Sequence, residues 1–104
     1  MGLMKIMIVE DDEALAEEIR AFLGRWGYQT AAARQFDRVL EEFSQISPQL
    51  VLLDINLPFY DGFYWCEKIR QVSAVPILYI SSRSDDRDQI MAMAQGGDDY
   101  IEKP

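Results

Sequence analysis

Residues 50–54 have the sequence Leu-Val-Leu-Leu-Asp, four consecutive aliphatic side chains followed by a carboxylate. A strand with one exposed face alternates apolar and polar residues, so this unbroken run predicts a parallel strand that is buried on both faces. Asp54 would then stand at the carboxyl end of a central strand, which is the edge where ligands bind in open α/β sheets. Residues 55–62 contain a proline, a glycine and polar side chains, and they predict a loop that begins at Asp54.

Strands and helices are predicted to alternate along the whole chain. Apolar runs predict the strands, at residues 4–9, 28–32, 50–54, 77–80 and 99–101. Helical periodicity predicts the helices, at residues 13–26, 36–47, 62–72 and 85–95. The predicted fold is therefore α/β, a doubly wound five-stranded parallel sheet in one domain over residues 1–104.

Several single residues predict how these helices begin, end and pack. Asp12 and Asp61 are suited to cap the first and third helices, and Gly27 is suited to a left-handed stop. Cys66 has the spacing of a packing residue. The first helix is expected to place one set of side chains toward the core: Leu15, Ile19, Phe22, Leu23 and Trp26.

The composition excludes several classes of function. The chain carries 18 acidic and 10 basic residues and a net charge of −8, which argues against direct nucleic-acid binding by this segment. It has no histidine, so Ser-His or Cys-His catalysis and histidine metal ligands are excluded. A single cysteine predicts a reducing, cytoplasmic location, and no apolar run approaches the ~20 residues that span a bilayer, so no membrane partner is expected.

Polar side chains gather at the ends of the predicted strands. Glu10 and Asp11 follow the first strand, Asp54 ends the third, Ser81 ends the fourth and Lys103 follows the fifth. Carboxyl ends of parallel strands meet at one edge of the sheet, so three carboxylates, a hydroxyl and an ammonium converge there. Carboxylates ~4 Å apart repel by about 4 kcal/mol at an effective dielectric of ~20, which predicts a bound cation. Oxygen ligands alone favour Mg²⁺, and a carboxylate beside Mg²⁺ and a lysine suits nucleophilic attack on a phosphoryl group.

Each part of this set also has an ordinary structural explanation. An acidic run at a helix start is often a solvated cap, and Asp12 and Glu13 suit that role. A serine pair after a strand is usually a turn, and a lysine near a strand end is usually at the surface. The joint occurrence of these residues at the ends of successive buried strands favours a site.

The same residues form motifs that span nearly the whole chain in one order. The motifs are Ile8-Val9-Glu10-Asp11-Asp12, Leu53-Asp54 with Leu57-Pro58 and Asp61-Gly62, Pro76-Ile77 through Ser81-Ser82-Arg83, and Gly97-Asp98-Asp99-Tyr100 with Lys103-Pro104. In these motifs the sequence resembles the receiver domains of two-component response regulators, which have a flavodoxin-like fold. Residues 60–66 and 80–83 further resemble the winged-helix (OmpR/PhoB-type) regulators of bacitracin and antimicrobial-peptide resistance systems.

The resemblance implies a role for each matching position. Asp54 would accept a phosphoryl group from the phosphohistidine of a sensor histidine kinase. Mg²⁺ would be bound by Asp11, Asp54 and the backbone carbonyl of Asn56, with Glu10 acting largely through water. Lys103 would pair with a phosphoryl oxygen.

The resemblance also implies a conformational switch. Ser81 would hydrogen-bond the phosphoryl group, and Tyr100 would turn inward when Ser81 moves. This movement would change the face of the fourth helix and fifth strand, through which a homodimer is expected. Asn56 and Arg83 occupy the positions where receivers tune hydrolysis of the acyl phosphate. The chain would be a switch rather than an enzyme.

The sequence departs from the receiver pattern after Lys103-Pro104. Receivers continue into a fifth helix and, in this class, into a DNA-binding domain, and both are missing from these 104 residues. We expect an exposed apolar flank where the fifth helix would pack, and marginal stability or association through it. DNA binding would belong to the missing C-terminal domain.

Two other classes of protein compete with the phosphorylated switch. A haloacid-dehalogenase-type phosphatase also uses a strand-end aspartate and Mg²⁺, but it needs a second acid two residues later, where this chain has Asn56. A phosphate-independent pseudo-receiver would keep the fold and bind partners only. The complete set of strand-end residues, Glu10, Asp11, Asp54, Ser81 and Lys103, argues against the pseudo-receiver.

Overall fold

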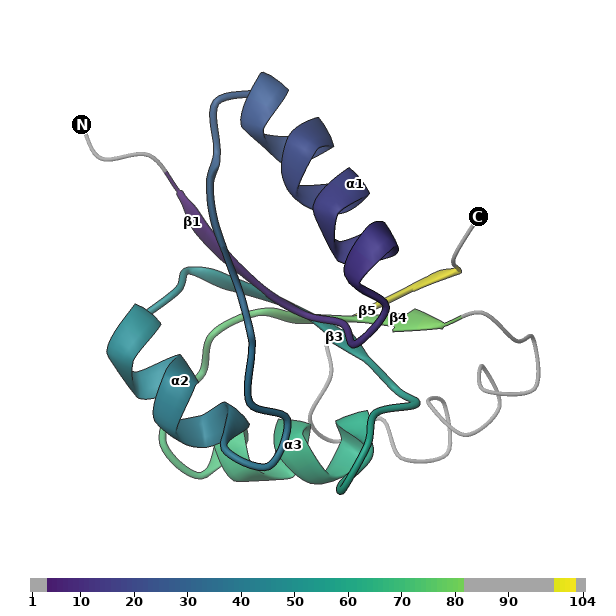
Figure 1. The fold of residues 1–104 in the computed structure, drawn as a ribbon. Helices are drawn as coiled ribbons and strands as arrows, with labels where there is room; N and C mark the ends of the chain where they lie inside the picture. Colours follow the sequence, from purple (N-terminus) through teal and green to yellow (C-terminus); the bar gives the residue numbers. More distant parts are fainter. Residues whose placement is uncertain (1–3, 82–98, 103–104) are drawn as a thin grey trace.

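The computed structural model describes residues 4–81 and 99–102, and it confirms the predicted α/β sheet (Figure 1). Its elements in chain order are β1 (Lys5–Val9), α1 (Glu13–Arg25), β2 (Gln29–Ala32), α2 (Val39–Ile46), β3 (Leu50–Asp54), α3 (Gly62–Arg70), β4 (Ile77–Ser81) and β5 (Asp99–Glu102). All strand pairs are parallel, and the order across the five-stranded sheet is β2-β1-β3-β4-β5. The apolar run at 50–54 forms the middle strand, with the predicted bounds.

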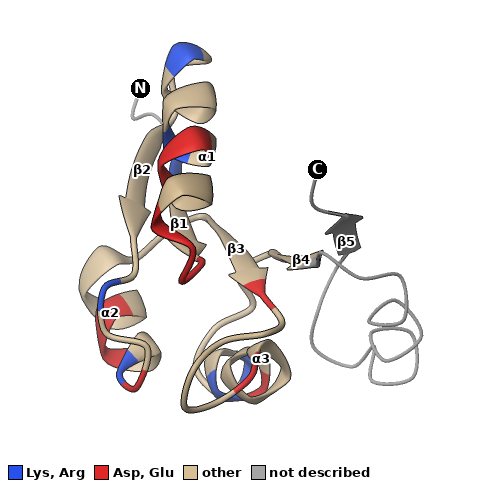
Figure 2. Ribbon diagram, turned by 45° about the vertical axis from the view of Figure 1, so that its right-hand side comes forward, with Lys and Arg blue, Asp and Glu red and all other residues tan. Residues whose placement is uncertain are grey.

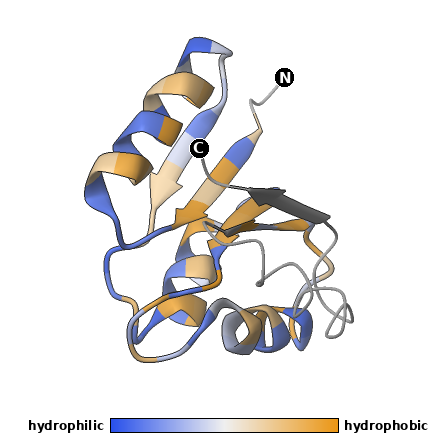
Figure 3. Ribbon diagram, turned by 90° about the vertical axis from the view of Figure 1, so that its right-hand side faces the viewer, coloured by the Kyte–Doolittle hydropathy of each residue, from blue (hydrophilic) through white to orange (hydrophobic). Residues whose placement is uncertain are grey.

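The described helices cover both faces of the sheet. Helix α1 lies on one face, and α2 and α3 lie on the other (Figures 1 and 3). On the α1 face, Ala16 packs with side chains of alternate strand residues, Ile6, Ile8 and Leu52. Because both faces of β1 and β3 are buried, these strands carry continuous apolar runs.

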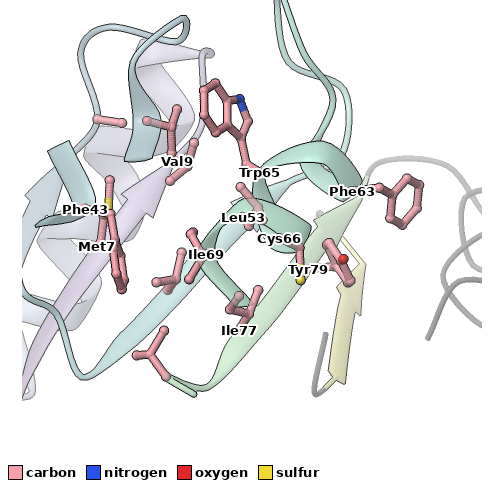
Figure 4. Close-up of a cluster of buried hydrophobic side chains, with 14 of the residues drawn as sticks. Met7, Val9, Phe43, Leu53, Phe63, Trp65, Cys66, Ile69, Ile77 and Tyr79 are labelled. Atoms are coloured by element: carbon pink, nitrogen blue, oxygen red, sulfur yellow. The ribbon is translucent and has the colours of Figure 1, made fainter. Parts of the chain in front are cut away.

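The larger core lies between the sheet and helices α2 and α3 (Figure 4). Met7, Val9, Val51 and Leu53 of the strands are buried against Phe43 and the inner residues of α3. The inner residues of α3 are Phe63, Trp65, Cys66 and Ile69. Cys66 is buried beside Tyr79 of β4, as the prediction of a packing role required.

The predicted helix caps are confirmed. Asp12 accepts a hydrogen bond from the backbone N–H of Leu15 at 3.2 Å, and Asp61 accepts one from Tyr64 at 2.9 Å. Each bond satisfies an N–H that has no partner in the first turn of a helix. Gly27 follows α1 with a φ of 89°, the left-handed conformation that favours glycine.

The predicted inward face of α1 is wrong for two residues. Phe22 and Trp26 are 53% and 71% exposed, whereas Ala16 is buried against the sheet. Helix α1 meets the strands along the line of Ala16, Ile19 and Leu23. Phe22 is rotated away from that line, and Trp26 follows the end of the helix. They pack on one another, with ring centroids 6.5 Å apart.

Helix α2 begins three residues later than its periodicity predicts. The carboxylate of Glu42 accepts hydrogen bonds from the backbone N–H groups of Arg34 and Gln35, which holds the preceding segment outside the helix. Phe36 nevertheless packs against the core from this segment. The helix predicted at 85–95 lies outside the described residues.

Candidate functional site

The register of the sheet brings Glu10 and Asp54 to the same level of its carboxyl edge. Val9 pairs with Leu53, so Glu10, the next residue, lies opposite Asp54. Asp54 in turn pairs with Ile80, which places Ser81 one residue farther along the same edge. The acidic turn between β1 and α1 and the acidic tip of β3 both lie at this edge (Figure 2).

Three carboxylates meet at this edge, as the sequence predicted. Glu10, Asp11 and Asp54 each offer a ligand oxygen, and these oxygens all lie within 4.8 Å of one another. Glu10 and Asp54 are 3% and 2% exposed, while Asp11 is exposed at the surface. Two of the negative charges are therefore largely removed from bulk water, where they are costly unless a cation or a hydrogen bond compensates them.

Backbone N–H groups orient the two buried carboxylates. Asp12 donates to Glu10 Oε2 at 3.0 Å, and Asn56 donates to Asp54 Oδ1 at 3.3 Å. Both bonds link residues two positions apart. The turn after β1 therefore orients Glu10, which follows the last residue of that strand, and the turn after β3 orients Asp54, which is the last residue of its strand. The local sequence of each loop thus sets the direction of its acidic group.

The donor set fits Mg²⁺. Two unit charges 4.8 Å apart repel by about 3.5 kcal/mol at an effective dielectric of ~20, so binding a divalent cation between them relieves the repulsion. The site offers only hard oxygen ligands, and Mg²⁺ is characteristically held by one or two carboxylates with water completing the shell. Glu10, Asp11 and Asp54 are the described residues that would hold the ion.

A feature that the sequence analysis missed lies behind Asp54. Gly62, the first residue of α3, is buried, and its N–H donates to the carbonyl oxygen of Ile55 at 2.8 Å. A Cβ at position 62 would clash with the Asp54 carbonyl oxygen and would lie 3.0 Å from Ile55 Cα. Glycine is therefore required where α3 packs on the backbone of the predicted phosphoacceptor, a long-range contact that no local pattern shows.

Part of the predicted site lies outside the described residues. Lys103 and Arg83 are not described. Ser81 and Tyr100 are described for their backbones alone: Ser81 pairs with Glu102, and Tyr100 pairs with Tyr79. Their predicted roles, and that of the Asn56 carbonyl oxygen, stay predictions.

Burial perturbs one ionisable group near the site. Desolvation raises the pKa of the Tyr79 hydroxyl well above its usual range, and a hydrogen bond with Cys66 raises it further. Tyr79 is buried two residues before Ser81, so β4 is fixed in the core by a neutral phenol close to the edge.

Among the described residues, no helix has the length and apolarity needed to cross a membrane.

The chain resembles known proteins over nearly its full length. Residues 6–104 match the model of the response regulator receiver domain. The chain is 56% identical over 100 residues to the transcriptional regulatory protein YxdJ of Bacillus subtilis (strain 168), covering 96% of this chain and 44% of that protein. It is 48% identical over 101 residues to the response regulator protein GraR of Staphylococcus aureus (strain JH9), covering 97% of this chain and 45% of that protein.

A solved structure of a response regulator domain has the same fold as this chain. The N-terminal domain of NsrR, described as a lantibiotic response regulator and nisin resistance regulator, superposes with a TM-score of 0.88 at 39% identity. The alignment covers 99% of this chain and 87% of that domain. The chain spans less than half the length of YxdJ and GraR. On the match over residues 6–104, the chain belongs to the response regulator receiver domain family.

Proposed function

We propose that this receiver domain is a phosphorylation-controlled switch in which Asp54 accepts a phosphoryl group from the phosphohistidine of a sensor histidine kinase. The observation that carries the proposal is the position of Asp54. Its carboxylate ends the central strand, is oriented by the Asn56 N–H, and lies within 4.8 Å of ligand oxygens of Glu10 and Asp11. An oriented carboxylate beside a cation site is the arrangement that phosphoryl transfer needs.

The proposed reaction makes one bond and breaks one. A carboxylate oxygen of Asp54 attacks phosphorus in line with the N–P bond of the phosphohistidine, and the O–P bond forms as the N–P bond breaks. The kinase imidazole leaves with the electron pair of that bond, and the product is an acyl phosphate on Asp54. The protein contributes mainly orientation and electrostatic stabilisation to this transfer.

Mg²⁺ would supply charge neutralisation for the incoming phosphoryl oxygens. Glu10, Asp11 and Asp54 would hold it, together with the backbone carbonyl of Asn56. A phosphoryl group brings nearly two further negative charges to an edge that already carries three carboxylates. Transfer in the absence of a divalent cation is therefore expected to be very slow.

The output of the switch would pass through β4 and β5. Ser81 would hydrogen-bond the phosphoryl group, Lys103 would pair with one of its oxygens, and Tyr100 would change its position in response. Ser81 ends β4 at the same edge as Asp54, and Tyr100 lies in the neighbouring strand, in register with Tyr79. The face that includes β5 is the proposed site of homodimer formation.

We further propose that the chain is the receiver part of a longer cytoplasmic transcription regulator. YxdJ is a transcriptional regulatory protein more than twice as long as this chain, and NsrR is a nisin resistance regulator. We propose a role in resistance to antimicrobial peptides because NsrR is a nisin resistance regulator. DNA binding would belong to a separate C-terminal domain, because a chain with a net charge of −8 repels phosphate.

The test is labelling of Asp54 by a small phosphoryl donor. The chain is incubated with acetyl phosphate, with and without Mg²⁺, and its intact mass is recorded. A Mg²⁺-dependent increment of one phosphoryl group is expected in the unsubstituted chain. Asp54→Asn should abolish it.

Asp61→Asn is the matched control for this experiment. It removes a carboxylate from the same loop but keeps the cap on α3, because asparagine caps helices as well as aspartate does. The control should be labelled like the unsubstituted chain. Equal labelling of Asp54→Asn would place the phosphoryl group on another residue, and a folded chain that takes no label would favour a pseudo-receiver. Either result would contradict the proposed function.

A further inference from the structure

Helix α3 contacts both of the strands that end beside the phosphoacceptor. Gly62, its first residue, lies against the backbone of Asp54, the last residue of β3. Cys66 follows four residues later, one turn along the same face of the helix. A hydrogen bond links its thiol to the hydroxyl of Tyr79 in β4 (Figure 4). One face of α3 therefore touches β3 at the site and β4 just before it.

The Tyr79 side chain is more firmly fixed than packing alone requires. The residue is 2% exposed, and its ring packs against that of Phe63 with centroids 5.3 Å apart. A phenylalanine would fill the same space without burying a hydroxyl, which costs free energy unless a hydrogen-bond partner compensates it. The Cys66 thiol is such a partner, so the hydroxyl gives β4 one defined position relative to α3.

The contact with α3 matters because the sheet is stretched at the level of the site. Ile80 pairs with Asp54, and Ser81 follows it as the last residue of β4. The N–H of Ile55 donates to the Ile80 carbonyl oxygen at 3.4 Å, whereas such bonds are usually about 2.9–3.0 Å long. The bond between β3 and β4 at this level is therefore weak, and α3 supplies a second restraint on the distance between Asp54 and Ser81.

We propose that Tyr79 is a positioning residue for phosphoryl transfer. Its bond with Cys66 holds β4 against α3 and thereby sets the position of Ser81 relative to the Asp54 carboxylate. The inference rests on the proposed function, in which Ser81 would hydrogen-bond the phosphoryl group on Asp54. A displacement of about 1 Å in such a site can slow a reaction by up to about 100-fold, so a bond in the core can affect the rate without touching the phosphoryl group.

A double-mutant cycle tests whether the bond sets the rate. Tyr79→Phe and Cys66→Ala each remove one partner of the bond, and a third chain carries both changes. Each chain is incubated with acetyl phosphate and Mg²⁺, and the rate constant for labelling is taken from the intact mass over time. We expect each single change to lower the rate constant about three- to tenfold. The double variant should be no slower than the slower single variant, because all three chains lack the same bond.

Two further variants separate the bond from general stability. Cys66→Ser keeps a group that can bond to the Tyr79 hydroxyl, and it should be labelled at close to the unsubstituted rate. Ile69→Val removes a methyl group from a buried residue of α3 outside the bond, so it should lower stability but leave the rate unchanged. Urea unfolding of each chain identifies those that are folded under the assay conditions. Tyr79→Phe carries the test alone if Cys66→Ala does not fold.

The Ser81→Ala background shows whether Tyr79 acts through Ser81. The hydroxyl to be positioned is absent there, so adding Tyr79→Phe should lower the rate no further. A general effect on the fold would lower the rate in both backgrounds and would overturn the inference.

Two other results would also overturn it. One is labelling of Tyr79→Phe at the unsubstituted rate, and the other is a Cys66→Ser chain as slow as Cys66→Ala. Failure of acetyl phosphate to label the unsubstituted chain would instead contradict the proposed function.

Discussion

Gly62 lies directly against the backbone of Asp54, so the first residue of α3 supports the proposed phosphoacceptor from behind. A Cβ at position 62 would clash with the Asp54 carbonyl oxygen and would come within 3.1 Å of its carbonyl carbon. Both contacts are with backbone atoms, so either the start of α3 or the end of β3 would have to move. The position of the carboxylate therefore depends on the absence of one methyl group.

Gly62→Ala is accordingly expected to destabilise the chain by about 2–3 kcal/mol, the usual cost of forcing an extra carbon into a packed site. Gly24→Ala is the matched control, because Gly24 is at an exposed position of α1 and a Cβ there meets nothing within 4 Å. That change should stabilise the chain by about 0.5–1 kcal/mol. Urea unfolding of both variants measures the difference, and a Gly62→Ala variant as stable as Gly24→Ala would refute the contact.

Mg²⁺ is expected to stabilise the chain through its three clustered carboxylates. At a concentration 100 times its dissociation constant, an ion that binds only the folded state adds about 2.7 kcal/mol. Asp11→Asn should reduce this gain and should also raise the melting temperature without Mg²⁺, because it relieves repulsion with Glu10 and Asp54. Glu18→Gln, on the exposed side of α1, serves as control. An unchanged Mg²⁺ effect in Asp11→Asn would place the ion elsewhere.

The raised pKa of Tyr79 predicts a loss of stability at alkaline pH. Because its pKa is raised in the folded chain, the unfolded chain releases the phenol proton first, above pH ~10, while the folded chain still holds it. The free energy of unfolding is thus unaffected by this group below pH ~10 and falls above it, by up to about 1.4 kcal/mol per pH unit.

Tyr79→Phe isolates this effect. The variant loses the hydrogen bond with Cys66, which should cost about 0.5–1.5 kcal/mol at pH 7. Between pH 9 and 11 its stability should then fall less steeply than that of the unsubstituted chain, as measured by urea unfolding at each pH. Parallel pH profiles for the two chains would show that Tyr79 ionises normally when folded.

Phe59, in the loop between β3 and α3, has a left-handed φ of 70°, and this conformation should store strain that a better-suited residue releases. Phe59→Gly is expected to raise the free energy of unfolding or leave it unchanged, because a left-handed φ costs a side-chain-bearing residue about 1–2 kcal/mol. Glycine also has greater freedom in the unfolded chain, which offsets part of the gain. A clear loss of stability in thermal melts would show that contacts of the Phe59 ring outweigh the strain of its backbone.

Local patterns predicted the sheet and the acidic cluster because both depend on short-range features. The apolar run at 50–54 predicted the central strand, and Asp12 and Asp61 predicted the starts of two helices. Each aspartate accepts a hydrogen bond from the backbone N–H three residues later. Parallel pairing then brings Glu10 level with Asp54. This follows from topology without knowledge of any side-chain contact.

Features that depend on how elements meet could not be predicted in the same way. Helical periodicity groups Phe22 and Trp26 with Ile19 and Leu23, but the way α1 packs on the sheet leaves the two aromatic residues exposed. The need for glycine at position 62 arises from the close approach of α3 to β3. A left-handed phenylalanine contradicts its intrinsic preference, so no sequence pattern would place Phe59 there.

The central claim is that Asp54 carries the phosphoryl group, and mapping the modified residue tests it most directly. The chain is labelled with acetyl phosphate and Mg²⁺, the acyl phosphate is reduced with borohydride, and the modified position is found by fragment mass after proteolysis. The account predicts that aspartate is converted to homoserine at position 54 alone. Conversion at Asp11 or another carboxylate, with Asp54 unmodified, would contradict it.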